Sequence, residues 1–262
     1  MLGATGYLGS EFLILLARDF PGYPVVALVR DPTFEKRTRL NEIHPNVTVV
    51  EGTLNDADII IEQVLKADIV INSASSDHWP SVKAILDGLE KSSASRPGKP
   101  PLYIHISGCG IISDNARGEL NENIKVWSDI DLDLKEGRFR AGVQKTTLWL
   151  RIFLDYAKKI GYAGTWGPGR NIQNTIHVRD MADIVLFVFK AALEGKAAEG
   201  ADGLYFACTD TTIAWGVWAS KMGDQRTCQG ARLQTDASRS GRALGSLYAR
   251  STNSNDAPLT PL

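Results

Sequence analysis

The chain has 262 residues, enough for one large domain or two small ones, and its 44% hydrophobic and 23% charged residues are ordinary for a globular protein. A formal net charge of −1 gives no general attraction to nucleic acid or to an anionic membrane. Three scattered cysteines and four dispersed histidines form neither a disulfide framework nor a zinc-ligand spacing, which excludes the disulfide-rich and zinc-finger classes and predicts no metal site.

Targeting and membrane signals are also missing from the sequence. No apolar run approaches the roughly 18 residues that a transmembrane helix needs, and no signal peptide precedes the first glycines. We therefore expect a cytoplasmic protein whose partner is a small-molecule substrate, with no nucleic-acid or membrane partner.

The first nine residues predict a phosphate-binding turn that opens a helix. Gly3 permits a tight turn, Gly6 lets the main chain approach a pyrophosphate, and Gly9 lets the helix pack closely on a sheet. The helix then presents free N–H groups and its positive dipole end to the phosphates. An apolar helix, a Pro-Gly pair and an apolar strand at 25–29 complete half of a βαβ unit. This context favours dinucleotide binding over a plain glycine turn.

The strand that should precede the glycines is reduced to Met1 and Leu2. In a doubly wound sheet this strand is central, and losing four or five buried side chains at roughly 1.5–3 kcal/mol each removes about 6–15 kcal/mol. That loss is as large as the net stability of a whole domain, about 5–15 kcal/mol. We therefore expect a chain that starts at Met1 to be aggregation-prone and to bind dinucleotide weakly, unless another segment fills the place of this strand.

Helix and strand patterns alternate through the first half of the chain. The expected elements are a helix over 33–41, a strand over 47–51, a helix over 56–67 capped by Asp56, a strand over 69–71, a helix starting near Pro80, a flexible loop over 92–101 and a strand over 102–106. Apolar strands that alternate with amphipathic helices predict an α/β fold, with a parallel sheet covered on both faces.

The regularity drops after Gly110. The expected elements are an acidic amphipathic stretch over 127–134, a helix over 148–160, a glycine-rich loop over 161–169, a helix over 181–193, a short strand over 204–206 and a last helix capped by Thr212. Polar composition without periodicity predicts a disordered tail. We thus divide the chain into a dinucleotide-binding core (1–110), the rest of the sheet with a substrate-side subdomain (111–224), and the tail (225–262).

Four stretches in this order resemble the extended short-chain dehydrogenase/reductase superfamily, in particular its atypical epimerase-like and NmrA-like members found in fungi. They are the turn at 3–9, Asn72-Ser73-Ala74, Ile104-His105-Ile106-Ser107-Gly108 and Ile176-His177-Val178-Arg179-Asp180-Met181-Ala182. The last matches the His-Val-x-Asp-x-Ala pattern that links sheet and substrate domain in extended members. The resemblance covers about residues 1–224 with gaps. It implies a Rossmann-type doubly wound parallel sheet with NAD(P) across the carboxyl ends of the strands.

The resemblance also implies the cofactor-binding residues: Gly3, Thr5, Gly6, Tyr7, Leu8 and Gly9 in the turn, Arg30 after the second strand, Thr53 and Leu54 after the third, and Ala74 and Ser75 after the fourth. Family members often carry Asp where this chain has Thr53. NAD-specific sites place an acid at the end of the second strand, whereas Arg30 can bind a 2′-phosphate bidentately. We therefore expect NADP to bind better than NAD, the alternative being that Arg30 is simply solvated.

Catalysis in the superfamily uses a Ser/Thr hydroxyl and a Tyr-x-x-x-Lys pair, in which Tyr is the acid/base and Lys⁺ lowers its pKa. The hydroxyl position aligns with Cys109, with Ser107 two residues earlier, and these two are the catalytic candidates. After the fifth strand no tyrosine stands four residues before a lysine, because Ala141 holds that position ahead of Lys145. Family members carry a helix and a strand where this chain has only residues 134–141, so we infer a missing segment, or else a naturally compact variant.

Three histidines receive different interpretations. His78 follows a strand and faces either the nicotinamide or solvent, His177 is expected to be a structural hinge residue, and His105 is expected in the core.

These patterns predict an NAD(P)-binding oxidoreductase-like protein acting on a small carbonyl, aldehyde or related substrate, with impaired catalysis. Two alternatives stay open: an NmrA-like sensor that reports redox state to a protein partner, and a sugar-nucleotide epimerase or dehydratase. The missing Tyr-x-x-x-Lys pair favours the sensor, whereas the linker at 177–182 and the apolar helices favour an enzyme ancestor.

Overall fold

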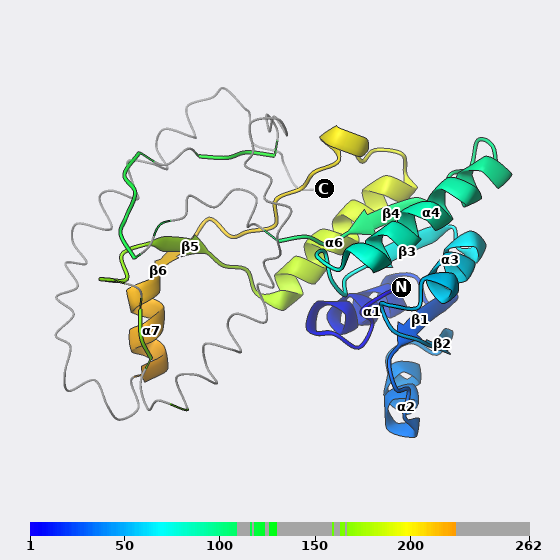
Figure 1. The fold of residues 1–262 in the computed structure, drawn as a ribbon, viewed down its shortest axis with the longest axis horizontal. Helices are drawn as coiled ribbons and strands as arrows, with labels where there is room; N and C mark the ends of the chain where they lie inside the picture. Colours follow the sequence, from blue (N-terminus) through cyan, green and yellow to red (C-terminus); the bar gives the residue numbers. More distant parts are fainter. Residues whose placement is uncertain are drawn as a thin grey trace.

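A computed structural model describes residues 1–108, 116, 118–123, 126–129, 159, 163–165 and 167–223. The first half of the chain forms a parallel sheet between helices (Figure 1). Its strands are β1 (Val25–Val29), β2 (Val47–Glu51), β3 (Ile69–Asn72) and β4 (Leu102–His105). β1 pairs with β2, and β3 pairs with β4, both in parallel. This arrangement confirms the parallel α/β sheet that the alternating apolar pattern predicts.

Leu2 joins the two pairs of strands. It forms parallel bridges to Leu28 of β1 and to Asn72 of β3. Its N–H donates to the carbonyl of Ile71 at 2.9 Å, while the Met1 carbonyl accepts from the N–H of Leu28 at 3.1 Å. The order across the sheet is therefore β2, β1, the Leu2 bridge, β3 and β4. Met1 and Leu2 thus lie in the central strand position, where the glycine turn begins.

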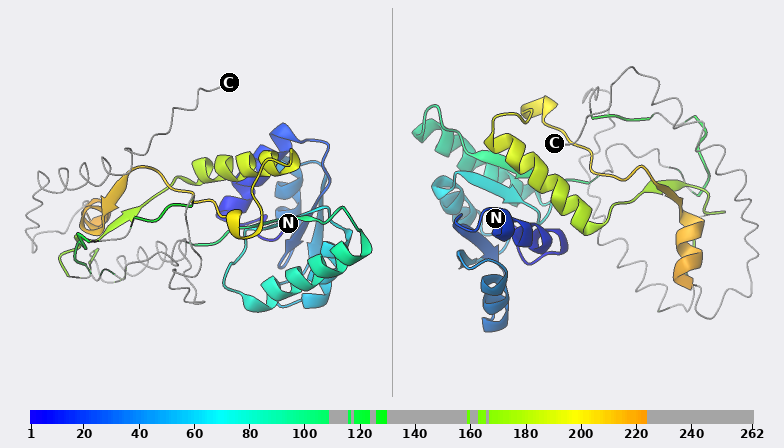
Figure 2. Two further views of the ribbon diagram at one scale, coloured as in Figure 1. Left: turned by 90° about the horizontal axis from the view of Figure 1, so that it is seen from above. Right: turned by 180° about the vertical axis from the view of Figure 1, so that it is seen from behind.

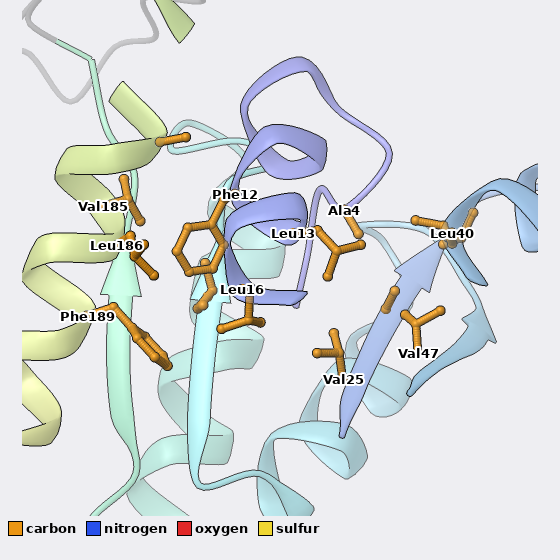
Figure 3. Packing of buried hydrophobic residues seen from close by; sticks show 14 residues of the cluster. Ala4, Phe12, Leu13, Leu16, Val25, Leu40, Val47, Val185, Leu186 and Phe189 are labelled. Carbon is orange, nitrogen blue, oxygen red and sulfur yellow. The ribbon is translucent and has the colours of Figure 1, made fainter. Parts of the chain in front are cut away.

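Alternate side chains of β1, β3 and β4 face two different helix layers, as the period of two in a strand requires. Helices α1 (Tyr7–Asp19) and α6 (Val178–Leu193) cover one face, and α3 (Ala57–Lys66) and α4 (Trp79–Ser95) pack together on the other. Figure 3 shows the first layer, where Phe12 of α1 meets Phe189 of α6 edge to face with ring centroids 6.0 Å apart. Residues from opposite halves of the chain therefore share one core.

The remaining elements are α2 (Phe34–Ile43), whose Leu40 joins the core of the first layer, and the elements of the C-terminal part. Helix α2 follows β1, and its first turn is capped by the Thr33 hydroxyl, which accepts from the N–H of Lys36 at 3.3 Å. In the C-terminal part, β5 (Ile172–Asn174) pairs antiparallel with β6 (Thr212–Ala214), which runs into α7 (Trp215–Gly223), and a 3₁₀ turn, η2, spans Gly200–Asp202. Both views of Figure 2 show β5, β6 and α7 away from the parallel sheet, beyond one end of α6.

Two expected helix boundaries were wrong. Helix α4 continues to Ser95, so the beginning of the expected loop over 92–101 is helical. The reason is a tertiary contact: Arg96 Nη1 donates to Asp68 at 2.7 Å and Nη2 donates to the Ala67 carbonyl at 2.6 Å, which holds the end of α4 against the start of β3. Helix α6 begins at Val178, three residues before the expected start, because His177 caps it.

Two expectations in the C-terminal part were also wrong. Residues 204–206 form no strand, and the N–H of Phe206 instead donates to the Asp129 carboxylate at 2.8 Å. Thr212 begins β6, opposite Asn174, and does not cap the last helix. The expected tail over 225–262, the segment inferred to be missing near 134–141 and nearly all of the helix expected over 148–160 lie outside the described residues. Within the described residues, no helix is both long and apolar enough to cross a membrane.

Candidate functional site

The glycine turn (residues 3–9) is closed so tightly that side chains are excluded at two positions. Gly3 has φ +86°, in the left-handed region, and a Cβ there would lie 2.7 Å from the backbone nitrogen of Ala74. At Gly9 a Cβ would lie 2.0 Å from the carbonyl oxygen of Gly3. The N–H of Gly6 donates to that same carbonyl at 2.9 Å. Glycine is therefore required at both positions by the path of the backbone.

The turn leads directly into an uncapped helix N-terminus. Helix α1 begins at Tyr7, its N-cap residue Gly6 has no side chain to accept a hydrogen bond, and no acidic residue lies in the first turn. The first N–H groups of a helix have no partner within the helix, and they carry the positive end of its dipole. Thr5, Gly6 and Tyr7 are exposed. This end of α1 is thus built to accept an anion from solvent.

The loop after β3 (residues 73–78, the 73–78 loop) lies against the glycine turn. Ser73 Oγ donates to the Leu2 carbonyl at 3.0 Å. The fully buried Asn72 holds the next residues: its Oδ1 accepts from the N–H of Ala74 at 3.2 Å, and its Nδ2 donates to the Ser75 carbonyl at 3.1 Å. Ala74 is exposed and Ser75 half-buried. The structure therefore brings two of the predicted cofactor residues beside the predicted pyrophosphate turn.

A cavity of about 260 Å³ opens at the carboxyl ends of β1 and β2. It is lined by Arg30, Asp31, Glu51, Gly52, Thr53, Asp56 and Ile59. Arg30 is exposed, and the Lys36 ammonium donates to the carbonyls of Arg30 and Asp31 at 3.0 and 2.7 Å, which fixes the loop that presents both residues. The cavity therefore combines one guanidinium with three carboxylates.

Asp56 is a cavity residue that the sequence reasoning missed, because it was interpreted only as a helix cap. It does occupy the N-cap position of α3, but its carboxylate turns back and accepts from the N–H and the hydroxyl of Thr53 at 2.6 and 2.8 Å. The backbone N–H bond, with the hydroxyl bond, holds the pKa of the Asp56 carboxyl below its ordinary value. Thr53 is thus engaged by an ionised acid three residues later, a spacing that could have signalled the contact.

A polar cluster lies where β3 and β4 end side by side. The Tyr103 hydroxyl is 2.7 Å from Nδ1 of His105, and Asn72 Nδ2 is 3.4 Å from the same nitrogen. Burial lowers the pKa of His105, an effect that the nearby Asp77 carboxylate partly offsets, and burial raises the pKa of Tyr103. His105 is half-buried rather than in the core, so the expectation of a core histidine was wrong. Tyr103 precedes His105 by two residues on β4, but Asn72 comes from β3, which the sequence alone does not pair with β4.

The catalytic candidate Ser107 and the other histidines lie outside the polar cluster of Asn72, Tyr103 and His105. Ser107 lies exposed just beyond β4, and Cys109 is outside the described residues. His78 Nδ1 accepts from the N–H of Ser81 at 3.2 Å and caps α4, while His177 caps α6 in the same way. Within the described residues, no three His, Cys, Asp or Glu side chains gather as a metal site.

Comparisons with known proteins cover different shares of the chain. Residues 1–90 match the model of the NmrA-like family. The oxidase ucsJ of Acremonium sp is 27% identical over 277 residues, covering 87% of this chain and 78% of that protein. Phenylcoumaran benzylic ether reductase of Ginkgo biloba is 32% identical over 93 residues, only 32% of this chain and 30% of the reductase.

Among solved structures, a protein described as an NAD-dependent epimerase/dehydratase from Methylobacillus flagellatus superposes with a TM-score of 0.53 at 16% identity. The superposition covers 93% of this chain and 89% of the other. At this identity the likeness concerns the fold alone, and it confirms the Rossmann-type α/β architecture that the sequence predicts.

Proposed function

From the chain's resemblance to extended short-chain dehydrogenase/reductase and NmrA-like NAD(P)-binding proteins, we propose that it binds a nicotinamide dinucleotide at the carboxyl edge of the sheet and is oxidoreductase-like. The observation that carries this proposal is the closed glycine turn with its uncapped helix. A helix N-terminus without a cap or an acid suits a pyrophosphate, because its N–H groups need acceptors and its dipole favours negative charge.

Each part of the site has a proposed role. The N–H groups at the start of α1 would hold the pyrophosphate, with Gly3 and Gly9 allowing its close approach. Thr53 and Leu54 would face the adenosine, and Ala74 and Ser75 the middle of the dinucleotide. When bound, the nicotinamide supplies the hydride chemistry. The protein's own contribution is to hold the phosphates and order the loops around them.

We propose that NADP binds more tightly than NAD. Arg30 is exposed at the cavity edge, and a charge-assisted contact to a phosphate contributes about 1.5–3 kcal/mol. The carboxylates of Asp31 and Glu51 line the same cavity and favour ribose hydroxyls over a phosphate. These opposed charges place the expected preference near the low end of that range, about tenfold.

Catalysis is proposed to be slow, on a small carbonyl, aldehyde or related substrate. No tyrosine of the sequence precedes a lysine by four residues, and Ser107 is an exposed residue beyond β4. General acid–base help contributes typically 10²–10⁴-fold, so its loss lowers turnover by about that factor.

The second candidate function is an NmrA-like sensor that binds the dinucleotide without turning it over and reports to a protein partner. Two observations favour it: the match of residues 1–90 to the NmrA-like family and the missing Tyr-x-x-x-Lys pair.

Calorimetric titration with NADP⁺ and NAD⁺ tests the proposal, using the unchanged chain, Gly9→Ala and Gly22→Ala. A Cβ at Gly22 would meet nothing within 4 Å, so this variant is the matched control. We expect the unchanged chain and Gly22→Ala to bind alike, and Gly9→Ala to lose binding. Binding that Gly9→Ala retains, or no binding by the unchanged chain, would overturn the proposal. Oxidation of NADPH with a panel of aldehydes and ketones then separates the slow enzyme from the sensor, which shows none.

A further inference from the structure

We propose that Tyr103 and His105 are positioning residues for the dinucleotide, acting through Asn72 and the 73–78 loop, and that protonation of His105 releases this loop and weakens dinucleotide binding. The inference rests on the proposed function, because the loop carries Ala74 and Ser75. It assigns a purpose to a polar cluster between two strand ends that the phosphate-binding turn does not need.

The orientation of Asn72 follows from its backbone partners. A backbone N–H can only donate, so the atom that accepts from Ala74 is the amide oxygen; a carbonyl can only accept, so the atom that meets Ser75 is the amide nitrogen. The side chain is fully buried and bonded to the loop at two successive residues. Any shift of Asn72 therefore moves the part of the loop beside the glycine turn.

The same orientation assigns the proton on His105. Asn72 Nδ2 is a donor, and it lies 3.4 Å from His105 Nδ1. The Tyr103 hydroxyl, 2.7 Å from Nδ1, also serves as a donor when that nitrogen is unprotonated. Nδ1 is thus the acceptor, and the neutral ring carries its proton on Nε2. The pairing of Asn72 with His105 across β3 and β4 keeps the two groups in register.

Protonation reverses this arrangement. A proton on Nδ1 faces the amide hydrogens of Asn72, which repels them, and it forces the Tyr103 hydroxyl to turn and accept. The groups around the imidazole are Tyr103 on β4, Asn72 on β3 and the Asp77 carboxylate in the loop itself. Asp77 favours the protonated ring, so acid exchanges the hold of Asn72 on Ala74 and Ser75 for an attraction between the imidazolium and Asp77, and the first part of the loop is released. Both changes act on the same six-residue loop.

The loop transmits this change because its first residue is fixed to Leu2, directly before the glycine turn. Ser73 donates to the Leu2 carbonyl from both its N–H, at 3.1 Å, and its hydroxyl, at 3.0 Å. Gly3 lies so close to Ala74 that a Cβ would be 2.7 Å from its nitrogen. A loop that is fixed at Ser73 and released at Ala74 and Ser75 changes shape where the dinucleotide is proposed to lie.

The test is the affinity for NAD⁺ at pH 8.0 and pH 5.5, since NAD⁺ has no 2′-phosphate that titrates in this range. We expect NAD⁺ to bind the unchanged chain more weakly at pH 5.5 than at pH 8.0, by a few-fold and by less than the roughly tenfold limit that a difference of one pKa unit between the bound and free states sets. His105→Gln should bind equally at both pH values, and Tyr103→Phe should bind more weakly than the unchanged chain at pH 8.0. His44→Gln is the control, because His44 is a buried histidine at the end of α2, away from the loop.

The outcome separates positioning from simple stabilisation. Melting temperatures of the unchanged chain should be similar at the two pH values, whereas its affinity for NAD⁺ should differ. If His105→Gln keeps the pH dependence of the unchanged chain, or if His44→Gln abolishes it, the inference is wrong. If the unchanged chain binds no dinucleotide at all, the proposed function fails and the inference fails with it. If the chain binds NAD⁺ equally at both pH values, the proposed function stands and only the inference is wrong. A proton on Nδ1 at pH 8.0, seen in the ¹⁵N shifts of His105, also contradicts the inference alone.

Discussion

The two ends of the proposed dinucleotide site are built in different ways. The glycine turn is closed by backbone packing, with Gly3 and Gly9 in places where a Cβ meets main-chain atoms. The cavity beside Arg30 is open and defined by charged side chains. A single methyl group is therefore expected to destroy the first, whereas the second should tolerate substitution and change its selectivity. The comparison separates residues that make the site from residues that choose its ligand.

The largest effect is expected for Gly3→Ala. The left-handed φ costs roughly 1–2 kcal/mol for a residue with a Cβ, and overpacking against the 73–78 loop adds about 1–3 kcal/mol. Gly98 has a similar φ of +78°, but a Cβ there meets nothing within 4 Å. Gly98→Ala should therefore cost only the first amount. Urea unfolding of both variants measures the difference, and equal losses would show that the turn is not closed by packing.

Leu2→Ala is expected to follow closely, with a loss of about 2–4 kcal/mol in the free energy of unfolding. Leu2 is 5% exposed and lies between β1 and β3, so its truncation leaves a cavity at the centre of the sheet. Leu65→Ala is the control, since that side chain is 40% exposed on α3. Should the two variants unfold at similar urea concentrations, the glycine turn does not depend on the bridge beneath it.

These two predictions rest on features that the sequence reveals to different degrees. The glycine spacing and the strand β2 are local patterns, and the strand predicted over 47–51 matches the observed bounds. The place of Leu2 could be inferred only from the fold that the glycine pattern implies. Contacts between strands were beyond reach, because the pairing of Asn72 with His105 depends on the register of β3 and β4.

The Arg30 cavity also depends on a contact between strands that the sequence does not reveal. Arg30 and Thr53 were predicted from their positions after strands, but the group formed by Glu51, Thr53 and Asp56 comes beside Arg30 only once β1 pairs with β2. The short-range rule that places Asp at a helix N-cap was correct about position and wrong about the hydrogen bond. The set of charged side chains that would select between NADP and NAD is thus the part of the site that is hardest to predict from a single sequence.

At the open end, Arg30→Gln should lower the affinity for NADP⁺ by about tenfold and leave the affinity for NAD⁺ unchanged, because only the 2′-phosphate contact is lost. An exposed substitution should alter the free energy of unfolding by no more than about 0.5 kcal/mol. Calorimetric titration with both dinucleotides measures the first effect. An equal loss of affinity for NAD⁺ would show that Arg30 contacts a part that both dinucleotides share, which contradicts its proposed role in selecting NADP.

The smallest effect concerns pH. His44 is fully buried, and burial lowers its pKa, so the unfolded chain binds the proton more readily than the folded one. Stability is therefore retained above the unfolded pKa of about 6.5 and falls as the pH drops below it, by at most about 1.4 kcal/mol per pH unit for one group. His44→Gln should flatten this part of the profile. Urea unfolding between pH 5.0 and 8.0 tests the sign, and a stability that rises toward acid would contradict it.

The most direct test of the central claim is hydrogen–deuterium exchange of the chain with and without NADP⁺. A dinucleotide at the carboxyl edge of the sheet should slow amide exchange in three places: at the start of α1, in the loop from Arg30 to Thr33, and in the 73–78 loop. Protection should be strongest in the glycine turn, where N–H groups are proposed to bind the pyrophosphate directly. Protection confined to residues 167–223, with the exchange of residues 3–10 unchanged, would contradict the account.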